Sequence, residues 1–163
     1  MNTSMRLLFA ALVVAAIPTL ASAQTPAAQS PPTVEILAAT SLAKMSDALP
    51  AGAINSVSVG QWPAEGLNGM LGRRDSDGVP ELHEGFTDIF VVQRGTATLR
   101  YGGTVAGNKV TTPGEWRGGT IEKGTDAVLH PGDVVVIPAG IPHQLLPAAG
   151  QHFIYLTFKV AKK

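Results

Sequence analysis

Cysteine is absent from the 163-residue chain. This absence excludes a structural disulfide, and it restricts any metal site to His, Asp and Glu ligands. Clustered positive charge is also lacking, because the formal net charge is zero and no run of Lys and Arg is longer than Arg73-Arg74 or Lys162-Lys163. A nucleic-acid-binding face needs grouped basic side chains, so the composition argues against that class of partner.

A hydrophobic run of membrane-spanning length is missing as well. The apolar segment Leu7–Ile17 is shorter than the roughly 20 residues that a transmembrane helix needs. It follows Arg6 and precedes Ala21-Ser22-Ala23, which is the order of a cleavable signal peptide. We therefore expect residues 1–23 to be a signal peptide removed after Ala23, and the mature protein to be periplasmic or secreted. An uncleaved membrane anchor is the alternative.

The remainder of the chain has the composition of one folded domain. Residues 24–33, rich in Ala, Pro, Gln and Ser, are expected to form a flexible leader, and residues 34–163 the domain. Glycine (18) and proline (12) are frequent and apolar runs are short, which is typical of a fold with many strands and turns. One short helix is expected at residues 41–49, capped by Thr40 or Ser41.

Five segments carry strand patterns. They show either the alternation of a half-buried strand or a short apolar run between turn residues, at 56–62, 89–92, 96–101, 134–137 and 153–160. Residues 103–120, rich in Gly and Thr, are the longest irregular stretch, and we expect them to form a hairpin excursion. The pattern predicts a predominantly β domain.

Potential metal ligands fall at positions that these strands would direct inward. Glu81 and His83 are two residues apart, so on a strand they project from the same face. Asp88 shares the alternating set of Phe90 in the next apolar run, and His143 follows a stiff Pro- and Gly-containing turn. Two imidazoles and two carboxylates that converge in one space suit a divalent transition metal.

The same residues resemble the motifs of the cupin superfamily. From Gly132 to His143 the chain reads Gly, five residues, Pro-x-Gly, two residues and His, which matches the second cupin motif at every spacing. Glu81, His83, Asp88 and Gly95 stand at the positions of the first motif, and the resemblance covers about residues 54–160. It is closest to small secreted single-domain proteins of the cupin-2 type. The resemblance implies an antiparallel jelly-roll β-barrel with a short N-terminal helix.

The chain departs from the usual cupin motifs at three positions. Glu81 replaces the usual first His, Asp88 replaces the usual Glu, and Pro147 replaces the usual Asn after the second motif. A centre formed by Glu81, His83, Asp88 and His143 would favour Mn, Fe or Zn over Cu, because it is rich in oxygen ligands. Asp88 is one methylene shorter than Glu, so it is either a fourth ligand or a hydrogen-bonding partner of His83.

The resemblance leaves function open between two classes. The first is a metal-dependent enzyme acting on a small molecule, of oxygenase, isomerase or lyase type, with a dioxygenase-like reaction the leading expectation. The second is a non-catalytic module that binds a small molecule or a metal. No catalytic residue beyond the ligands is identified. The resemblance also implies a homodimer, for which the apolar final strand and the helix are the candidate surfaces.

Several other side chains have two interpretations each. Arg73-Arg74 would either meet an anionic substrate or form an exposed loop pair. Phe90, Tyr155 and Trp62 would either line a pocket or pack in the core. The two remaining histidines are expected at the surface or in structural roles; they are His130 and His152.

Overall fold

The computed structural model describes residues 34–163, with the exception of residue 53. The predicted signal peptide (1–23) and leader (24–33) lie outside the described residues. Residues from Glu35 to Lys163 form one compact unit. No helix in the described part of the chain is long and apolar enough to cross a membrane.

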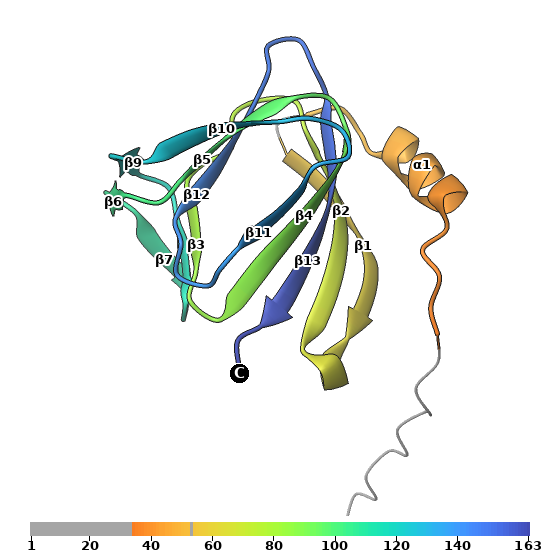
Figure 1. Ribbon diagram of the computed structural model, residues 1–163, viewed down its shortest axis with the longest axis horizontal. Helices are drawn as coiled ribbons and strands as arrows, with labels where there is room; N and C mark the ends of the chain where they lie inside the picture. The colour runs from red at the N-terminus through yellow and green to blue at the C-terminus, as the bar shows by residue number, and fades with distance from the viewer. Residues whose placement is uncertain (1–33, 53) are drawn as a thin grey trace, which may run out of the picture. The chain divides into compact units, whose positions relative to one another are not determined.

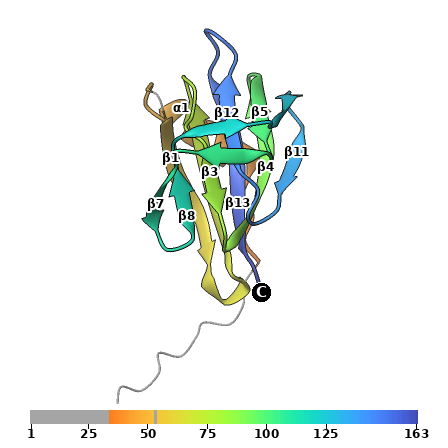
Figure 2. The same cartoon turned by 90° about the vertical axis from the view of Figure 1, so that its left-hand side faces the viewer.

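Two antiparallel sheets make up this unit, and they face each other in Figure 1 and, turned by 90°, in Figure 2. The first has five strands in the order β1 (Ile54–Trp62), β2 (Leu67–Arg74), β13 (Phe153–Ala161), β4 (Phe86–Arg94) and β11 (Val134–Ile137). The second has six strands in the order β10 (Thr125–Leu129), β5 (Ala97–Tyr101), β12 (His143–Pro147), β3 (Glu81–His83), β8 (Glu115–Arg117) and β7 (Lys109–Thr112).

The remaining elements are short. Strands β6 (Thr104–Ala106) and β9 (Thr120–Glu122) pair with each other, and a 3₁₀ turn, η1 (Pro63–Glu65), follows β1. The predicted all-β jelly roll is confirmed. Within the described residues, however, no strand pairing joins the two large sheets, so the architecture is a two-sheet sandwich and not a closed barrel.

The main hydrophobic core fills the space between the two sheets. Its buried residues are Phe90, Val92, Ala97, Leu99, Leu129, Ile137, Leu145, Phe153 and Tyr155. Strand β13 contributes alternate residues to this core and to a second cluster on the outer face of its sheet, so that strand is apolar on both faces. The second cluster consists of Leu49, Leu71, Ile154 and Leu156.

The helix α1 (Ala39–Ala48) covers this second cluster. The prediction of a helix here is confirmed, but the predicted cap is wrong, because the N-cap is Ala38 and no side chain caps the helix. Thr40 and Ser41 lie within the first turn. Leu42 and Met45 pack on the cluster, so tertiary contact compensates for the missing cap.

The stretch 103–120 is more regular than its sequence indicates. It contains β6, β7 and β8 and the start of β9, where a single hairpin excursion was expected. These strands are only three or four residues long, which is too short for alternation to be recognised in the sequence. Strand β8 contributes to the site, because it lies beside β3.

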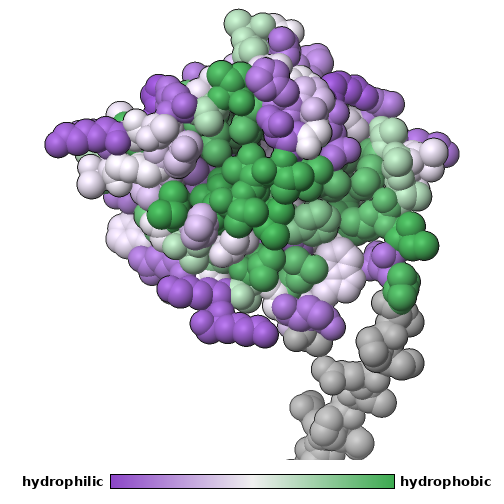
Figure 3. Space-filling view, viewed as in Figure 1, coloured by the Kyte–Doolittle hydropathy of each residue, from purple (hydrophilic) through white to green (hydrophobic). Residues whose placement is uncertain are grey.

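An apolar area lies at the centre of the face shown in Figure 3. Strand β11 is at one edge of its sheet, and the residues Val134 and Val136 are 62% and 59% exposed. A shallow apolar groove runs between β11 and the neighbouring residues of β5 and β10. By contrast β13, predicted as a pairing surface, lies in the middle of its sheet and offers no free edge.

Candidate metal centre

Strand register assembles the site. Strand β3 lies between β12 and β8, so Glu81 is paired with His143 on one side and with Arg117 on the other. His83 is paired with Glu115 in the same register. Directly opposed residues project from the same face of a sheet, so this register gathers acidic, basic and imidazole side chains in one place.

The turn between β11 and β12 fixes the position of His143. Gly140 adopts a φ of +83°, in the left-handed region that favours glycine, and its backbone N–H donates to the carbonyl oxygen of His83 at 2.7 Å. The turn residues that match the second cupin motif are therefore hydrogen-bonded directly to β3, the strand that carries Glu81 and His83.

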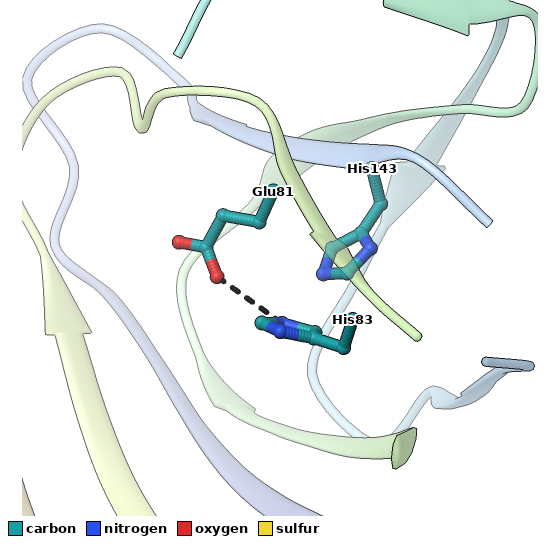
Figure 4. Close-up of side chains that lie close together, drawn as sticks. All are labelled: Glu81, His83 and His143. Atoms are coloured by element: carbon teal, nitrogen blue, oxygen red, sulfur yellow. Dashed lines mark ion pairs between the residues drawn. The ribbon is translucent and has the colours of Figure 1, made fainter. Parts of the chain in front are cut away.

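Glu81, His83 and His143 come together as predicted. One ligand atom from each lies within 4.8 Å of the other two. Figure 4 shows the three side chains directed toward a common space, with Glu81 and His83 arriving from β3 and His143 from β12. Both histidines are almost completely buried, at 2% and 4% exposure.

Hydrogen bonding defines which ring nitrogen of each histidine faces the common space. Nδ1 of His83 lies 2.5 Å from Oε2 of Glu115, and Nδ1 of His143 lies 3.1 Å from the carbonyl oxygen of Ile141. A carbonyl or a carboxylate oxygen can only accept, so Nδ1 carries the hydrogen in both rings. In a neutral ring Nε2 then carries a free lone pair, and this is the form of histidine that binds metals.

The two Nε2 atoms are buried and have no hydrogen-bond partner. Nε2 of His83 lies 3.5 Å from Oε2 of Glu81 and 3.4 Å from Oδ2 of Asp88. Lone pairs and carboxylate oxygens repel one another unless a cation, either a proton or a metal ion, lies among them. The donor set therefore fits a divalent metal ion.

Asp88 faces inward, as its position in the alternating set predicts, and is only 2% exposed. Its Oδ2 also lies 3.7 Å from Nε2 of His143. Both of its carboxylate oxygens accept from Nζ of Lys159, at 2.8 and 3.0 Å. Lys159 is the residue directly opposite Asp88 in the pairing of β13 with β4.

Two arginines contact the same oxygen, Oε1, of the Glu81 carboxylate. Oε1 of Glu81 lies 2.7 Å from Nη1 of Arg117 and accepts from Nη2 of Arg74 at 3.3 Å. Burial alone would raise the pKa of Glu81, but the His83 ring and the two guanidinium groups outweigh it and hold the pKa well below 4.5. Glu81 is therefore an anion at neutral pH, with Oε2 directed at the histidines.

The two histidines differ in their proton affinity. Burial lowers the pKa of His143 below 6.5, so this ring is neutral near neutral pH. Burial acts in the same direction on His83, but the surrounding carboxylates of Glu81, Asp88 and Glu115 outweigh it and raise the pKa of that ring above 6.5. A metal ion held at this ring would therefore have to compete with a proton on His83 at a pH where His143 is already neutral.

Arg74 is buried in the site, and the interpretation of Arg73-Arg74 as an exposed loop pair is wrong. Its Nε donates to the hydroxyl of Tyr155 at 2.7 Å, and its Nη1 is buried without a partner. Gly72, two residues earlier on the same strand, leaves room for the Tyr155 ring, because a Cβ there would lie 3.0 Å from two ring carbons. Arg73 points away and contacts Asp75.

A cavity of about 200 Å³ opens beside these residues. Its walls combine charged groups of the site with apolar side chains, including Phe90, Leu145, Tyr155, Arg74, Arg117 and Lys159. Phe90 and Tyr155 therefore both line the pocket and pack in the core, whereas Trp62 does neither. The volume suits a small molecule.

The other two histidines lie away from this cavity. His130 is exposed and neighbours Asp133, and His152 is exposed and hydrogen-bonds to Asp75. Sequence reasoning missed Glu115, Arg117 and Lys159 as members of the site. The first two lie in the stretch treated as irregular, and for Lys159 only its position in the final strand was available, which does not identify its partner.

No protein-family profile and no curated protein matches the sequence. Solved structures do resemble it in fold. A predicted oxalate decarboxylase from Thermotoga maritima is 12% identical, with 67% of this chain and 81% of that chain covered and a TM-score of 0.50. A vicilin from Solanum melongena is 18% identical, with 71% of this chain and 31% of that chain covered and a TM-score of 0.51. These likenesses show that the chain has the cupin fold, as its motifs predict.

Proposed function

We propose that the chain binds one divalent metal ion, Mn, Fe or Zn, through Glu81, His83 and His143, and that it is a metal-dependent enzyme acting on a small molecule. The observation that carries the proposal is the pair of buried Nε2 atoms without partners, directed at carboxylate oxygens 3.4 to 3.7 Å away. Three protein ligands leave coordination positions for a substrate.

The charges around the cavity favour an anionic substrate. Its wall has three cationic side chains, Arg74, Arg117 and Lys159, and two carboxylates, so the formal charge is +1 before a divalent ion adds two more. An apolar wall beside a positive centre suits a small carboxylate. The vicilin with the same fold was described with different anionic ligands in structurally similar pockets.

Each residue would have a distinct part in this function. A bound divalent ion supplies Lewis-acid catalysis, and with Fe or Mn also redox chemistry of the oxygenase type. Arg117, 41% exposed, would contact an entering anion, while buried Phe90 and Tyr155 exclude water from one side of the cavity. Glu115 would keep the His83 ring in the ligating tautomer.

A non-catalytic binding module is the second candidate, and one observation favours it. Both carboxylates that line the cavity are already paired, Glu81 with two arginines and Asp88 with Lys159. Within the described residues of the cavity wall, therefore, no unpaired carboxylate is available as a general base. Turnover would then depend entirely on the metal ion.

Export is part of the proposal and is supported by sequence alone. Arg6, the apolar segment Leu7–Ile17 and the small residues before Gln24 have the order of a cleavable signal peptide. We expect a periplasmic or secreted protein whose mature form begins at Gln24. Mass spectrometry of the protein from its native host measures this terminus, and an intact N-terminus in an envelope fraction would indicate an anchor.

Elemental analysis of protein purified without a chelating tag tests the metal site. We expect one divalent ion per chain in the wild type, and none in His83→Ala or His143→Ala. His130→Ala, which removes an exposed histidine, is the matched control and should retain the ion. A chelator should lower the melting temperature of the wild type and leave that of His83→Ala unchanged. Equal metal content in all four proteins would refute the ligand assignment.

Oxygen consumption with a panel of small carboxylates then separates the two functional candidates. Metal-dependent consumption or conversion that is lost in His143→Ala would support the enzyme. A carboxylate that binds in calorimetry and is recovered unchanged would support the binding module.

A further inference from the structure

Lys159 has an unusual position for a lysine next to a candidate metal centre. It lies on β13, directly opposite Asp88 on β4, and its Nζ donates to both oxygens of that carboxylate. The Asp88 side chain is 3% exposed and that of Lys159 is 16% exposed, so water screens the pair only weakly. Charge-assisted hydrogen bonds to both oxygens hold the carboxylate in one orientation.

Asp88 lies close enough to the two histidines to bind the same metal ion. Its Oδ2 is 3.4 Å from Nε2 of His83, as close as Oε2 of Glu81 at 3.5 Å, and it is 3.7 Å from Nε2 of His143. Asp88 and Glu81 differ in their cationic partners. Arg74 and Arg117 both contact Oε1 of Glu81 and leave Oε2 free, whereas Lys159 occupies both oxygens of Asp88.

We propose that Lys159 is a positioning residue that holds Asp88 in an ion pair and so limits the metal centre to three protein ligands. The inference rests on the proposed metal site and goes beyond it, because it assigns a residue that sets the number of ligands and the charge of the centre. A divalent ion with Glu81, Asp88 and Lys159 carries a formal charge of +1. Without the ammonium group this set is neutral, so Lys159 also favours an anionic substrate.

Co²⁺ titration of the full mature protein, followed by absorbance, tests this assignment in a way that structural damage cannot imitate. In Lys159→Met the released Asp88 carboxylate should join the ligands, and Co²⁺ affinity should rise roughly tenfold or more, because a positive charge beside the ion is lost and an anionic oxygen ligand is gained. The double variant Lys159→Met/Asp88→Asn replaces an ion pair of zero net charge by two uncharged side chains. Its Co²⁺ affinity should therefore return to that of the wild type. Lys159→Arg keeps the cation and should also match the wild type.

The matched control is Lys44→Met, which removes an exposed lysine from α1 and should leave Co²⁺ affinity unchanged. The assignment is overturned if Lys159→Met binds Co²⁺ no more tightly than the wild type. It is equally overturned if the double variant loses as much affinity as Glu81→Gln, because Asp88 would then be a ligand already. A wild type and a Lys159→Met that both fail to bind Co²⁺ would refute the proposed metal site together with this inference.

Discussion

Glu115 lies outside the proposed ligand set but contacts one of its members, His83. Its carboxylate accepts from Nδ1 of His83, and so leaves Nε2 of that ring available to a metal ion. The strand pairing places Glu115 directly opposite His83, and no other described side chain hydrogen-bonds to that Nδ1. We therefore regard Glu115 as the residue that orients the first histidine, in the way that the Ile141 carbonyl orients the second.

We expect Glu115→Ala to weaken metal binding by about 10–100-fold, because His83 loses both its orientation and its fixed tautomer. Glu115→Gln keeps an acceptor oxygen and should have a smaller effect. Calorimetric titration with Mn²⁺ or Zn²⁺ measures both. Glu122→Ala, at an exposed position of β9, is the control. Unchanged affinity in Glu115→Ala would show that the His83 ring is held by packing alone.

At the scale of elements, one carboxylate joins three segments on the opposite side of β2 from the cavity. Asp75 accepts from the backbone N–H of Gly52 at 2.9 Å, and it contacts Arg73 and His152. Arg73 in turn donates to the carbonyl oxygen of Leu49, at the end of α1. This network connects the helix, the end of β2 and the start of β13, and so supports the strand that carries Arg74.

We expect Asp75→Asn to lower the melting temperature at neutral pH. The hydrogen bond from Arg73, followed by that from Gly52, lowers the pKa of Asp75 well below 3.8. A depressed carboxylate pKa contributes stability above the unfolded-state value, and the contribution is lost as pH falls through the folded-state value. The difference between wild type and variant should therefore be complete at pH 7 and shrink below about pH 3.8.

Thermal unfolding at a series of pH values measures this difference, and Asp77→Asn, which removes an exposed carboxylate from the same loop, controls for net charge. A difference that stayed constant down to pH 2 would mean that Asp75 acts through packing and not through its charge.

At the scale of the whole molecule, the edge of the five-stranded sheet is the feature most suited to self-association. Strand β11 has one unpaired edge within the described residues and exposes Val134 and Val136, beside the apolar groove that reaches β10. A hydrophobic edge strand without charges is a template for pairing with another strand. The near-zero net charge of the chain adds little long-range repulsion between two copies.

We therefore propose a homodimer through β11, and expect the double variant Val134→Lys/Val136→Lys to be a monomer. Light scattering at micromolar concentration gives the mass of each protein. Val110→Lys introduces the same charge at an exposed valine of β7 and should remain a dimer. A monomeric wild type would end the proposal, and a dimer in the double variant would move the interface elsewhere.

The local pattern of the sequence determined which side chains face inward. Alternation along a strand depends only on neighbouring residues, so Glu81, His83 and Asp88 could be assigned to the interior without a structure. The Pro- and Gly-containing turn before His143 is equally local, because its backbone conformations are set by those residues themselves. The inward orientation of the candidate ligands follows from these two regularities, and the jelly-roll fold was predicted from the resemblance to the cupin motifs.

Only the tertiary structure decided what each inward-facing group meets. Asp88 and Lys159 are 71 residues apart, and His83 and Glu115 are 32 apart. Which residues oppose each other depends on the register between distant strands, and a shift of one residue would exchange every partner. The packing of two whole sheets sets that register. The ion pair that occupies Asp88, and the carboxylate that orients His83, therefore become visible only when the sheets are assembled.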